Sequence, residues 1–151
     1  MRGVPATALI LALAGLLPFL WGAAMAVLPN PAALPLYRDM PAALRDEAVL
    51  VEYGIVILCF MSGVLWGFAA RTARARAAAG YAASVVPALW AFFAVRGAGE
   101  SALIALAAGF AGVLAIDWLF ARAGLAPSWW MRLRVPVTVV VLACLGTGIV
   151  F

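Results

Sequence analysis

Two acidic residues in this sequence lie where a carboxylate is costly. Asp117 stands in the apolar segment AIDWLFAR, and Glu52 stands near the start of the apolar segment VEYGIVILCF. An ionised side chain in a membrane helix costs about 2.5–3.5 kcal/mol at the bilayer centre and less toward the interface, so such groups tend to be paired or functional. We expect Asp117 to form a buried ion pair with Arg134 or Arg132, which approach the next apolar segment at the same level. Glu52 is a candidate for binding a ligand or a proton.

Few other residues in the chain offer chemistry. There is no His, no CxxC pair is present, and the two cysteines, Cys59 and Cys144, both lie inside apolar segments. An enzyme needs an activated nucleophile, a general base or a cofactor site, and a metal site needs ligands at suitable spacing. We therefore predict that the protein is not an enzyme and has no catalytic residue, no metal site and no dedicated cofactor.

The apolar segments predict the fold class. Of the 151 residues, 68% are hydrophobic and 11% are charged, whereas soluble domains are about half apolar. The apolar residues fall into blocks close to the roughly 20 residues that a helix needs to cross a bilayer. We predict an all-α integral membrane protein whose residues 1–151 form a single transmembrane helical domain. Its bundle of five transmembrane helices would span about residues 4–28, 49–70, 77–95, 101–121 and 135–151.

Prolines and small residues refine the first spans. Pro18 and Pro87 lie inside predicted helices and should kink them.

The stretch Ala24-Met25-Ala26 has the form of a signal-peptide cleavage site. The apolar block before it is longer than the usual 7–15 residues of a signal peptide, so we expect the first helix to be retained.

The arginines predict the orientation of the chain. With five spans, the N-terminus and the loops 71–76 and 122–134 lie on one side of the membrane. That side carries Arg2, Arg71, Arg74, Arg76, Arg122, Arg132 and Arg134, and the other side carries Arg38, Arg45 and Arg96. The positive-inside rule then places the N-terminus in the cytoplasm and the C-terminus in the periplasm. Because the arginines flank apolar spans, we expect no nucleic-acid partner.

Two connecting segments carry further expectations. In the loop 29–48, the sequence after Asp39 is typical of a helix start, with Asp39 as the N-cap, so the second span should extend beyond the membrane. That extension would carry Arg45, Asp46 and Glu47, either as a solvated helix end or as a docking surface. The segment PSWWMRLRVPVT should lie at the interface, capped by Ser128, as a simple anchor or as a site for anionic lipid.

Small residues predict where helices touch. One stripe of the second span contains Ser62, Gly63 and Gly67, with the glycines in GxxxG spacing, and the fourth span offers Gly109 and Gly112. Small residues at this spacing let two helix backbones approach closely. We predict all five as helix-packing residues, and the partner helix could belong to the same chain or to another one.

The same segments resemble a known family. The matching residues are Tyr53, Gly54, Ile57, Leu58, Phe60, Gly63, Trp66, Gly67, Ser84, Val85, Pro87, Asp117, Leu125, Pro127, Trp129, Leu133, Arg134, Pro136 and Thr138. This pattern resembles the uncharacterised membrane family, a domain of unknown function, that includes mitochondrial transmembrane protein 69, over nearly the whole chain. The resemblance implies a proteobacterial inner-membrane or mitochondrial setting and supplies no reaction.

The function expected from these observations rests on exclusion. Helix contact is the main activity that small-residue faces and short loops allow, so we expect an accessory or assembly subunit of a larger, respiratory or photosynthetic membrane complex. Its partners would be membrane lipids and other membrane protein subunits, and its location the bacterial inner (cytoplasmic) membrane, which it crosses several times. The alternatives are a small-molecule or ion transporter and a membrane protein that binds quinone or lipid between its helices.

Overall fold

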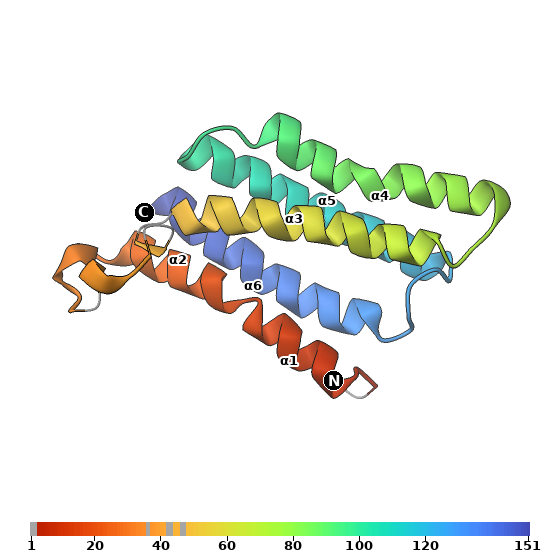
Figure 1. Ribbon diagram of the computed structural model, residues 1–151, viewed down its shortest axis with the longest axis horizontal. Helices are drawn as coiled ribbons and strands as arrows, with labels where there is room; N and C mark the ends of the chain where they lie inside the picture. Colours follow the sequence, from red (N-terminus) through yellow and green to blue (C-terminus); the bar gives the residue numbers. More distant parts are fainter. Residues whose placement is uncertain (1–2, 36, 42–43, 46–47) are drawn as a thin grey trace.

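The computed structural model describes residues 3–35, 37–41, 44–45 and 48–151, apart from the side chains of residues 74–76. Within these residues the regular structure is helical, and no strand is present. The α-helices are α1 (Ala6–Ala14), α2 (Leu17–Val27), α3 (Ala48–Ala69), α4 (Arg74–Ala94), α5 (Glu100–Arg122) and α6 (Trp130–Val150) (Figure 1). Two short 3-10 helices, η1 (Pro31–Ala33) and η2 (Tyr37–Asp39), lie in the long loop between α2 and α3.

Five helical segments are long and apolar enough to cross a membrane, as the sequence predicted. They are Ala6–Val27, which joins α1 and α2, Ala48–Ala69, Ala77–Ala94, Glu100–Arg122 and Trp130–Val150. Consecutive segments run in alternating directions, so α1 and α6 run in the same direction (Figure 1). The protein is therefore a membrane helical bundle whose loops gather at its two ends.

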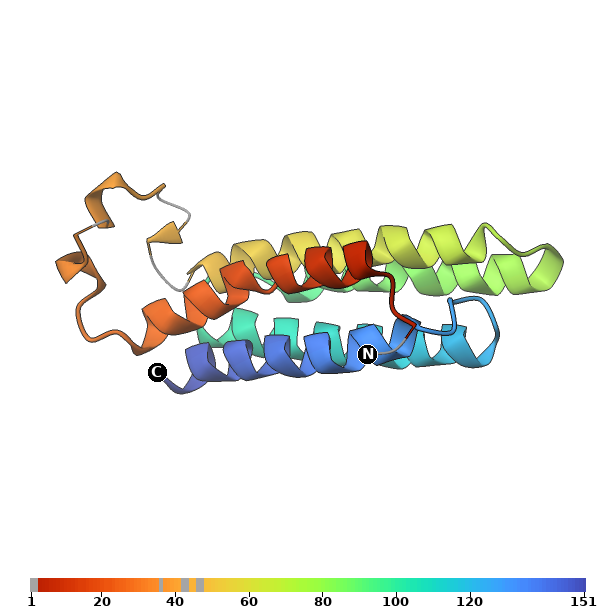
Figure 2. The same cartoon turned by 90° about the horizontal axis from the view of Figure 1, so that it is seen from below.

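The first span is interrupted where Pro18 was expected to kink it. Pro18 has no backbone N–H to donate to the carbonyl of Ala14 one turn earlier. Accordingly α1 ends at Ala14, the amide of Leu16 bonds to Leu13 O at 3.1 Å in a tighter turn, and α2 begins at Leu17. The two halves continue in one general direction along the bundle (Figure 2).

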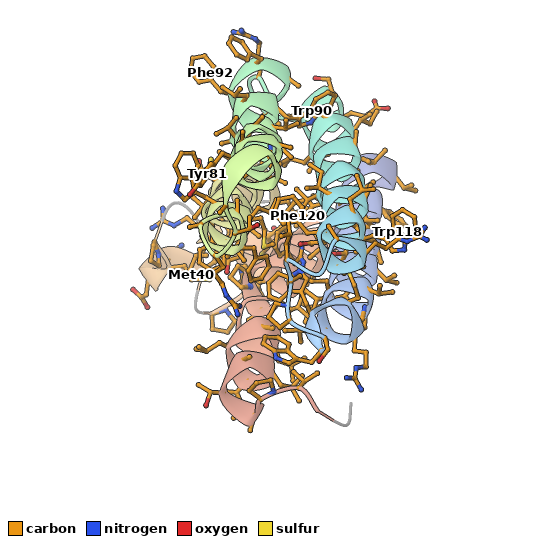
Figure 3. The ribbon with its side chains drawn as sticks, turned by 90° about the vertical axis from the view of Figure 1, so that its right-hand side faces the viewer. Met40, Tyr81, Trp90, Phe92, Trp118 and Phe120 are labelled. Atoms are coloured by element: carbon orange, nitrogen blue, oxygen red, sulfur yellow. The ribbon has the colours of Figure 1, made fainter. Side chains whose placement is uncertain are left out.

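The core is built from two helical hairpins and one covering helix. α3 packs mainly against α4, and α5 packs mainly against α6, while α2 packs against both α3 and α6. Leu58, Leu65 and Leu106 are completely buried between them. Figure 3 shows the bundle end-on, with Phe120 pointing between the helices, whereas Phe92 and Trp118 point outward. Large apolar side chains therefore cover both the inside and the outside of the bundle, which suits a lipid surround.

Glycines allow the closest helix approaches. A Cβ atom on Gly22 would lie 2.6 Å from Cγ1 of Val49, and one on Gly54 would lie 2.9 Å from Cδ1 of Leu106. The corresponding distance is 2.8 Å from Gly80 to the Cβ atom of Ala69. Such distances leave no room for a side chain, so α2, α3 and α4 approach their neighbours at these glycines.

The loop before α3 differs from the sequence prediction. α3 begins at Ala48, and the described residues between Met40 and Arg45 form no α-helix. Arg45 Nε instead donates to Met40 O at 2.8 Å, and Trp21 Nε1 donates to Leu44 O at 2.7 Å. These two carbonyls therefore accept side-chain bonds, from Arg45 nearby and from Trp21 on α2, and the predicted helical extension is wrong for the described residues of this stretch. Asp46 and Glu47 lie outside the described residues.

The start of α6 also differs from the sequence prediction. The helix begins at Trp130, five residues before the predicted start of the fifth span at residue 135, so Arg132 and Arg134 belong to its first turns. The location of this segment at the membrane interface stays a prediction. Trp129 occupies the N-cap position and makes no side-chain capping bond, so Ser128 does not cap the helix. The early start has a physical reason in the contacts of Trp130 and Arg134 with α5, described next.

Candidate functional site

A buried polar cluster joins α5 to α6. Asp117 on α5 is completely buried, and its Oδ2 atom accepts a hydrogen bond from Arg134 Nε at 2.8 Å. Its Oδ1 atom accepts a hydrogen bond from Trp130 Nε1 at 2.7 Å. Both carboxylate oxygens are therefore satisfied by side chains of α6, which is the condition for burying a charge in an apolar environment.

Local sequence explains why these three residues meet. Trp130 and Arg134 are four residues apart, so they share one face of α6. The turn between α5 and α6 brings that face to Asp117: Gly124 has a φ of 73°, the amide of Leu125 bonds to Phe120 O at 2.9 Å, and the Gly124 amide bonds to Ala121 O at 3.1 Å. This pair of bonds is the Schellman arrangement, which ends a helix and reverses the chain.

Two buried polar atoms beside this pair have no hydrogen-bond partner among the described residues. They are Nη2 of Arg134 and Oγ1 of Thr138. Arg134 is 6% exposed and Thr138 is 1% exposed. Buried polar atoms are nearly always hydrogen-bonded. Two unsatisfied atoms on residues one helical turn apart therefore mark a place where a polar atom of another molecule would be stabilised.

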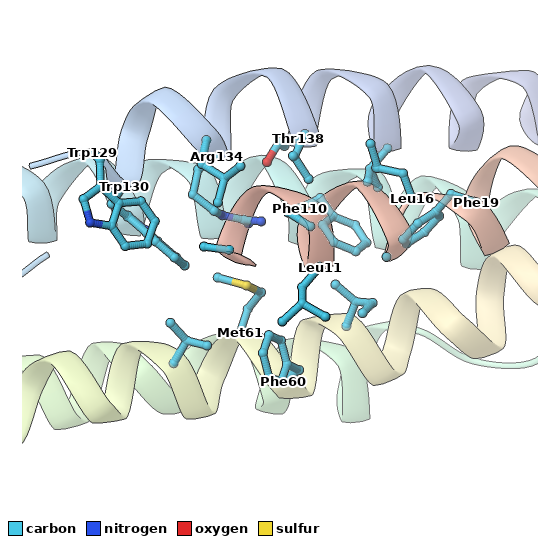
Figure 4. Close-up of a pocket in the computed structure, with 18 of the residues that line it drawn as sticks. Leu11, Leu16, Phe19, Phe60, Met61, Phe110, Trp129, Trp130, Arg134 and Thr138 are labelled. Carbon is cyan, nitrogen blue, oxygen red and sulfur yellow. The ribbon is translucent and has the colours of Figure 1, made fainter. Parts of the chain in front are cut away.

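Both atoms belong to residues that line an apolar cavity of about 350 Å³ (Figure 4). This size falls within the range of roughly 300–1,000 Å³ found for small-molecule sites. Apart from Arg134 and Thr138, the lining is apolar or aromatic. It consists of Ala8, Leu11, Ala12, Gly15, Leu16, Phe19, Ile57, Phe60, Met61, Val64, Phe68, Phe110, Pro127, Trp129, Trp130, Leu133, Val137 and Val141. A pocket with an apolar wall and a few convergent polar groups is typical of a binding site for a hydrophobic molecule.

The cavity reaches the outer surface of the bundle between α1 and α3. Leu11 on α1 and Phe60 on α3 both line it, and they are 67% and 63% exposed. Figure 4 shows these two side chains close together on the side of the cavity opposite α6. A molecule dissolved in the bilayer would therefore reach the cavity from the side, without passing through water.

A family comparison places the whole bundle in one group of proteins. Residues 4–150 match a protein family described as a protein of unknown function, DUF3429. The chain belongs to this family. The resemblance seen in the sequence is thus confirmed for a family of unknown function, and this match makes no link to mitochondrial transmembrane protein 69. Comparisons with curated proteins and with solved structures give no match.

The arginine that pairs with Asp117 is Arg134. Arg132 is exposed and lies beside the N-terminal segment, where a Cβ atom on Gly3 would be 3.4 Å from Arg132 Nη2. Glu52 is exposed on α3, and it is not among the residues that line the cavity. Within the described residues, no group of three or more His, Cys, Asp and Glu side chains could hold a metal ion.

The predicted helix-packing residues divide into two groups. Ser62 is buried, and its Oγ atom accepts a hydrogen bond at 2.9 Å from the amide of Ala88, which follows Pro87 in α4. Gly109 lies against Trp90 and Leu58, which a Cβ atom on it would approach to 2.8 Å and 2.9 Å. These two residues therefore pack helices within the chain.

The other three glycines face outward. A Cβ atom on Gly63, Gly67 or Gly112 would meet nothing within 4 Å. The expectation that these positions pack helices inside the bundle therefore does not hold, because α3 and α5 turn other faces toward their neighbours. Their contact with a helix of another chain stays a prediction.

Other residues of the family pattern lie in helix contacts, in the lining of the cavity or at the surface. Gly54 lies against Leu106, as described above. The Tyr53 ring packs edge-on against Phe19 with centroids 5.2 Å apart, and the Trp66 ring lies 4.5 Å from that of Tyr81. Three residues line the cavity, namely Phe60, Pro127 and Trp129, while Pro136 is exposed in α6.

Sequence reasoning missed two residues of the site. Trp130 was expected only as part of the interfacial segment PSWWMRLRVPVT, and the structure shows that it is buried and donates a hydrogen bond to Asp117. Thr138 appeared only in the family pattern, with no role in a site. The signal that could have found both is the spacing of Trp130, Arg134 and Thr138, which places them on one face of α6 at intervals of four residues.

Proposed function

We propose that this protein binds a hydrophobic molecule, a lipid or a quinone, in the cavity between α1, α3 and α6. The observation that carries the proposal is the unsatisfied Nη2 atom of Arg134, a buried residue that lines a cavity whose other walls, apart from Thr138, are apolar or aromatic. The Nε atom of the Arg134 guanidinium group donates to Asp117, and its Nη2 atom is left as a donor for a ligand. Binding without catalysis is part of this proposal.

The test is the material that remains bound to the purified protein. Ala12 lines the cavity from α1, so Ala12→Phe should fill part of it and lower the amount of co-purified lipid or quinone at least tenfold. The measurement is solvent extraction of the protein, purified in mild detergent, followed by mass spectrometry. Ala14→Phe is the matched control, because Ala14 is exposed on the same helix and does not line the cavity. Equal extracts from both variants would contradict the proposal.

A second candidate function is the accessory or assembly subunit of a larger membrane complex. The observation that favours it is the open space around Gly63 and Gly67 on α3 and around Gly112 on α5. Outward glycines offer a backbone-to-backbone contact to a helix of another protein. On a native gel of mild-detergent extracts, the wild type should co-migrate with other subunits, and Gly63→Leu/Gly67→Leu should migrate alone. Migration of the wild type alone would contradict this function.

For either function, we propose that the protein lies in a bacterial inner membrane. The arginine distribution supports an N-terminus in the cytoplasm and a C-terminus in the periplasm, in a bacterial inner membrane. The segment from Tyr53-Gly54 to Trp66-Gly67 supports kinship with mitochondrial transmembrane protein 69 and a proteobacterial source. Transport of a small molecule or an ion remains the further alternative, with Glu52 as its candidate residue.

A further inference from the structure

We infer that the cavity is selective for an uncharged carbonyl acceptor on a flat apolar ring, the chemistry of a quinone head group, over the carboxylate or phosphate of an anionic lipid. This inference rests on the proposed function, since it names the class of molecule bound at the same site. Its basis is the number of donors that Arg134 and Thr138 bring to the cavity, their net charge, and the shape of the apolar part.

The donors come from one face of α6. Arg134 Nη2 carries only N–H groups, so it can donate and cannot accept. The Thr138 hydroxyl can donate to the same acceptor from one turn further along, and it makes no bond to a backbone carbonyl. Figure 4 shows the Arg134 side chain reaching from α6 into the space that the cavity occupies, with the Thr138 hydroxyl next along the helix. A carbonyl oxygen, with two lone pairs, would accept from both groups.

The charge of the cluster argues against an anion. Asp117 lies 2.8 Å from Arg134 and neutralises it, and no other residue that lines the cavity is charged. A carboxylate or phosphate bound at Nη2 would add a second negative charge to a single buried arginine, in surroundings of low dielectric constant. An uncharged acceptor gains the hydrogen bonds without that repulsion and without the desolvation cost of an ion.

The apolar part of the cavity suits a ring with one tail. Phe19, Phe110 and Trp130 line it with aromatic surface, and Met61 adds a flexible thioether that favours contact with rings. Arg134 and Thr138 lie in the first half of α6, and the lining of the cavity runs past them in both directions, from Trp129 at the N-cap to Val141. A ring beside Arg134 and Thr138 would contact this aromatic lining, and its tail would leave between Leu11 and Phe60.

The experiment compares two ligands that differ mainly in the head group. Binding of decylubiquinone and of dodecanoate at pH 8 is followed by quenching of tryptophan fluorescence in the detergent-solubilised full chain, with isothermal titration as the second measurement. We expect decylubiquinone to bind at least tenfold more tightly. If dodecanoate binds as tightly or more tightly, the inference is overturned while the proposed ligand site stands. If neither ligand binds, the proposed function itself falls.

A conservative variant tests the assigned donor. Thr138→Val removes the hydroxyl, keeps the shape and leaves the bonds of Asp117 intact, so it should fold normally and weaken decylubiquinone binding about fivefold to tenfold. Dodecylbenzene, which lacks the acceptor, should bind equally well to both proteins. The matched control is Thr147→Val on the same helix, since the Thr147 hydroxyl bonds to Ala143 O at 3.0 Å and lies outside the cavity. Unchanged decylubiquinone affinity in Thr138→Val would overturn the inference.

Discussion

Replacing Asp117 with Asn is expected to lower the free energy of unfolding by about 3–5 kcal/mol, because it leaves a buried arginine without its counter-charge. Asp117 is completely buried, and both of its oxygens accept bonds from α6. Asn can accept through only one oxygen, so either Trp130 or Arg134 loses its acceptor. The measurement is thermal unfolding of the purified protein in detergent, followed by circular dichroism, together with the amount of protein that accumulates in the membrane.

Three further variants, Arg132→Gln, Arg134→Gln and Asp117→Asn/Arg134→Gln, separate the ion pair from a general effect of charge removal. Arg132→Gln removes a nearby but exposed arginine and should change stability little. The double variant Asp117→Asn/Arg134→Gln removes both charges, so it should be more stable than the sum of the two single changes predicts. Strict additivity, or a wild-type melting curve for Asp117→Asn, would show that the buried pair does not hold α5 to α6.

The polar part of the site was more predictable than the cavity. The ion pair was predictable because a carboxylate in an apolar span needs a partner. Arg134 is that partner in the structure. The cavity depends on the break between α1 and α2 at Pro18 and on how α1 then lies beside Phe60. Sequence locates the break, since proline chemistry is local. The distance between two helices far apart in the chain is a property of tertiary packing, which no local pattern specifies.

The buried faces of the helices were the least predictable feature. In a soluble helix the core face is apolar and the outer face is polar, so the periodicity shows which side is buried. In α3 the outward Phe60 and the inward Leu58 are both apolar, because lipid surrounds the bundle. Gly54 and Gly63 are therefore indistinguishable by pattern, although only Gly54 packs against another helix of this chain.

Gly54→Leu is expected to destabilise the bundle by about 1–3 kcal/mol or more, since the added side chain would enter filled space. A Cβ atom at this position lies 2.9 Å from Cδ1 of Leu106, which is itself completely buried between α3 and α5. Leu106 cannot move away without displacing other core side chains. The expected result is a lower melting temperature and less folded protein, measured by circular dichroism and by size-exclusion chromatography in detergent.

Gly63→Leu is the matched control on the same helix, because it adds the same side chain where a Cβ atom meets nothing within 4 Å. It should melt like the wild type as an isolated chain, or slightly higher, since leucine favours the helix more than glycine does. If Gly63→Leu is destabilised as much as Gly54→Leu, the orientation of α3 described above is wrong. If it folds normally and yet loses co-migrating subunits on a native gel, the outward face of α3 is a contact surface for another membrane protein.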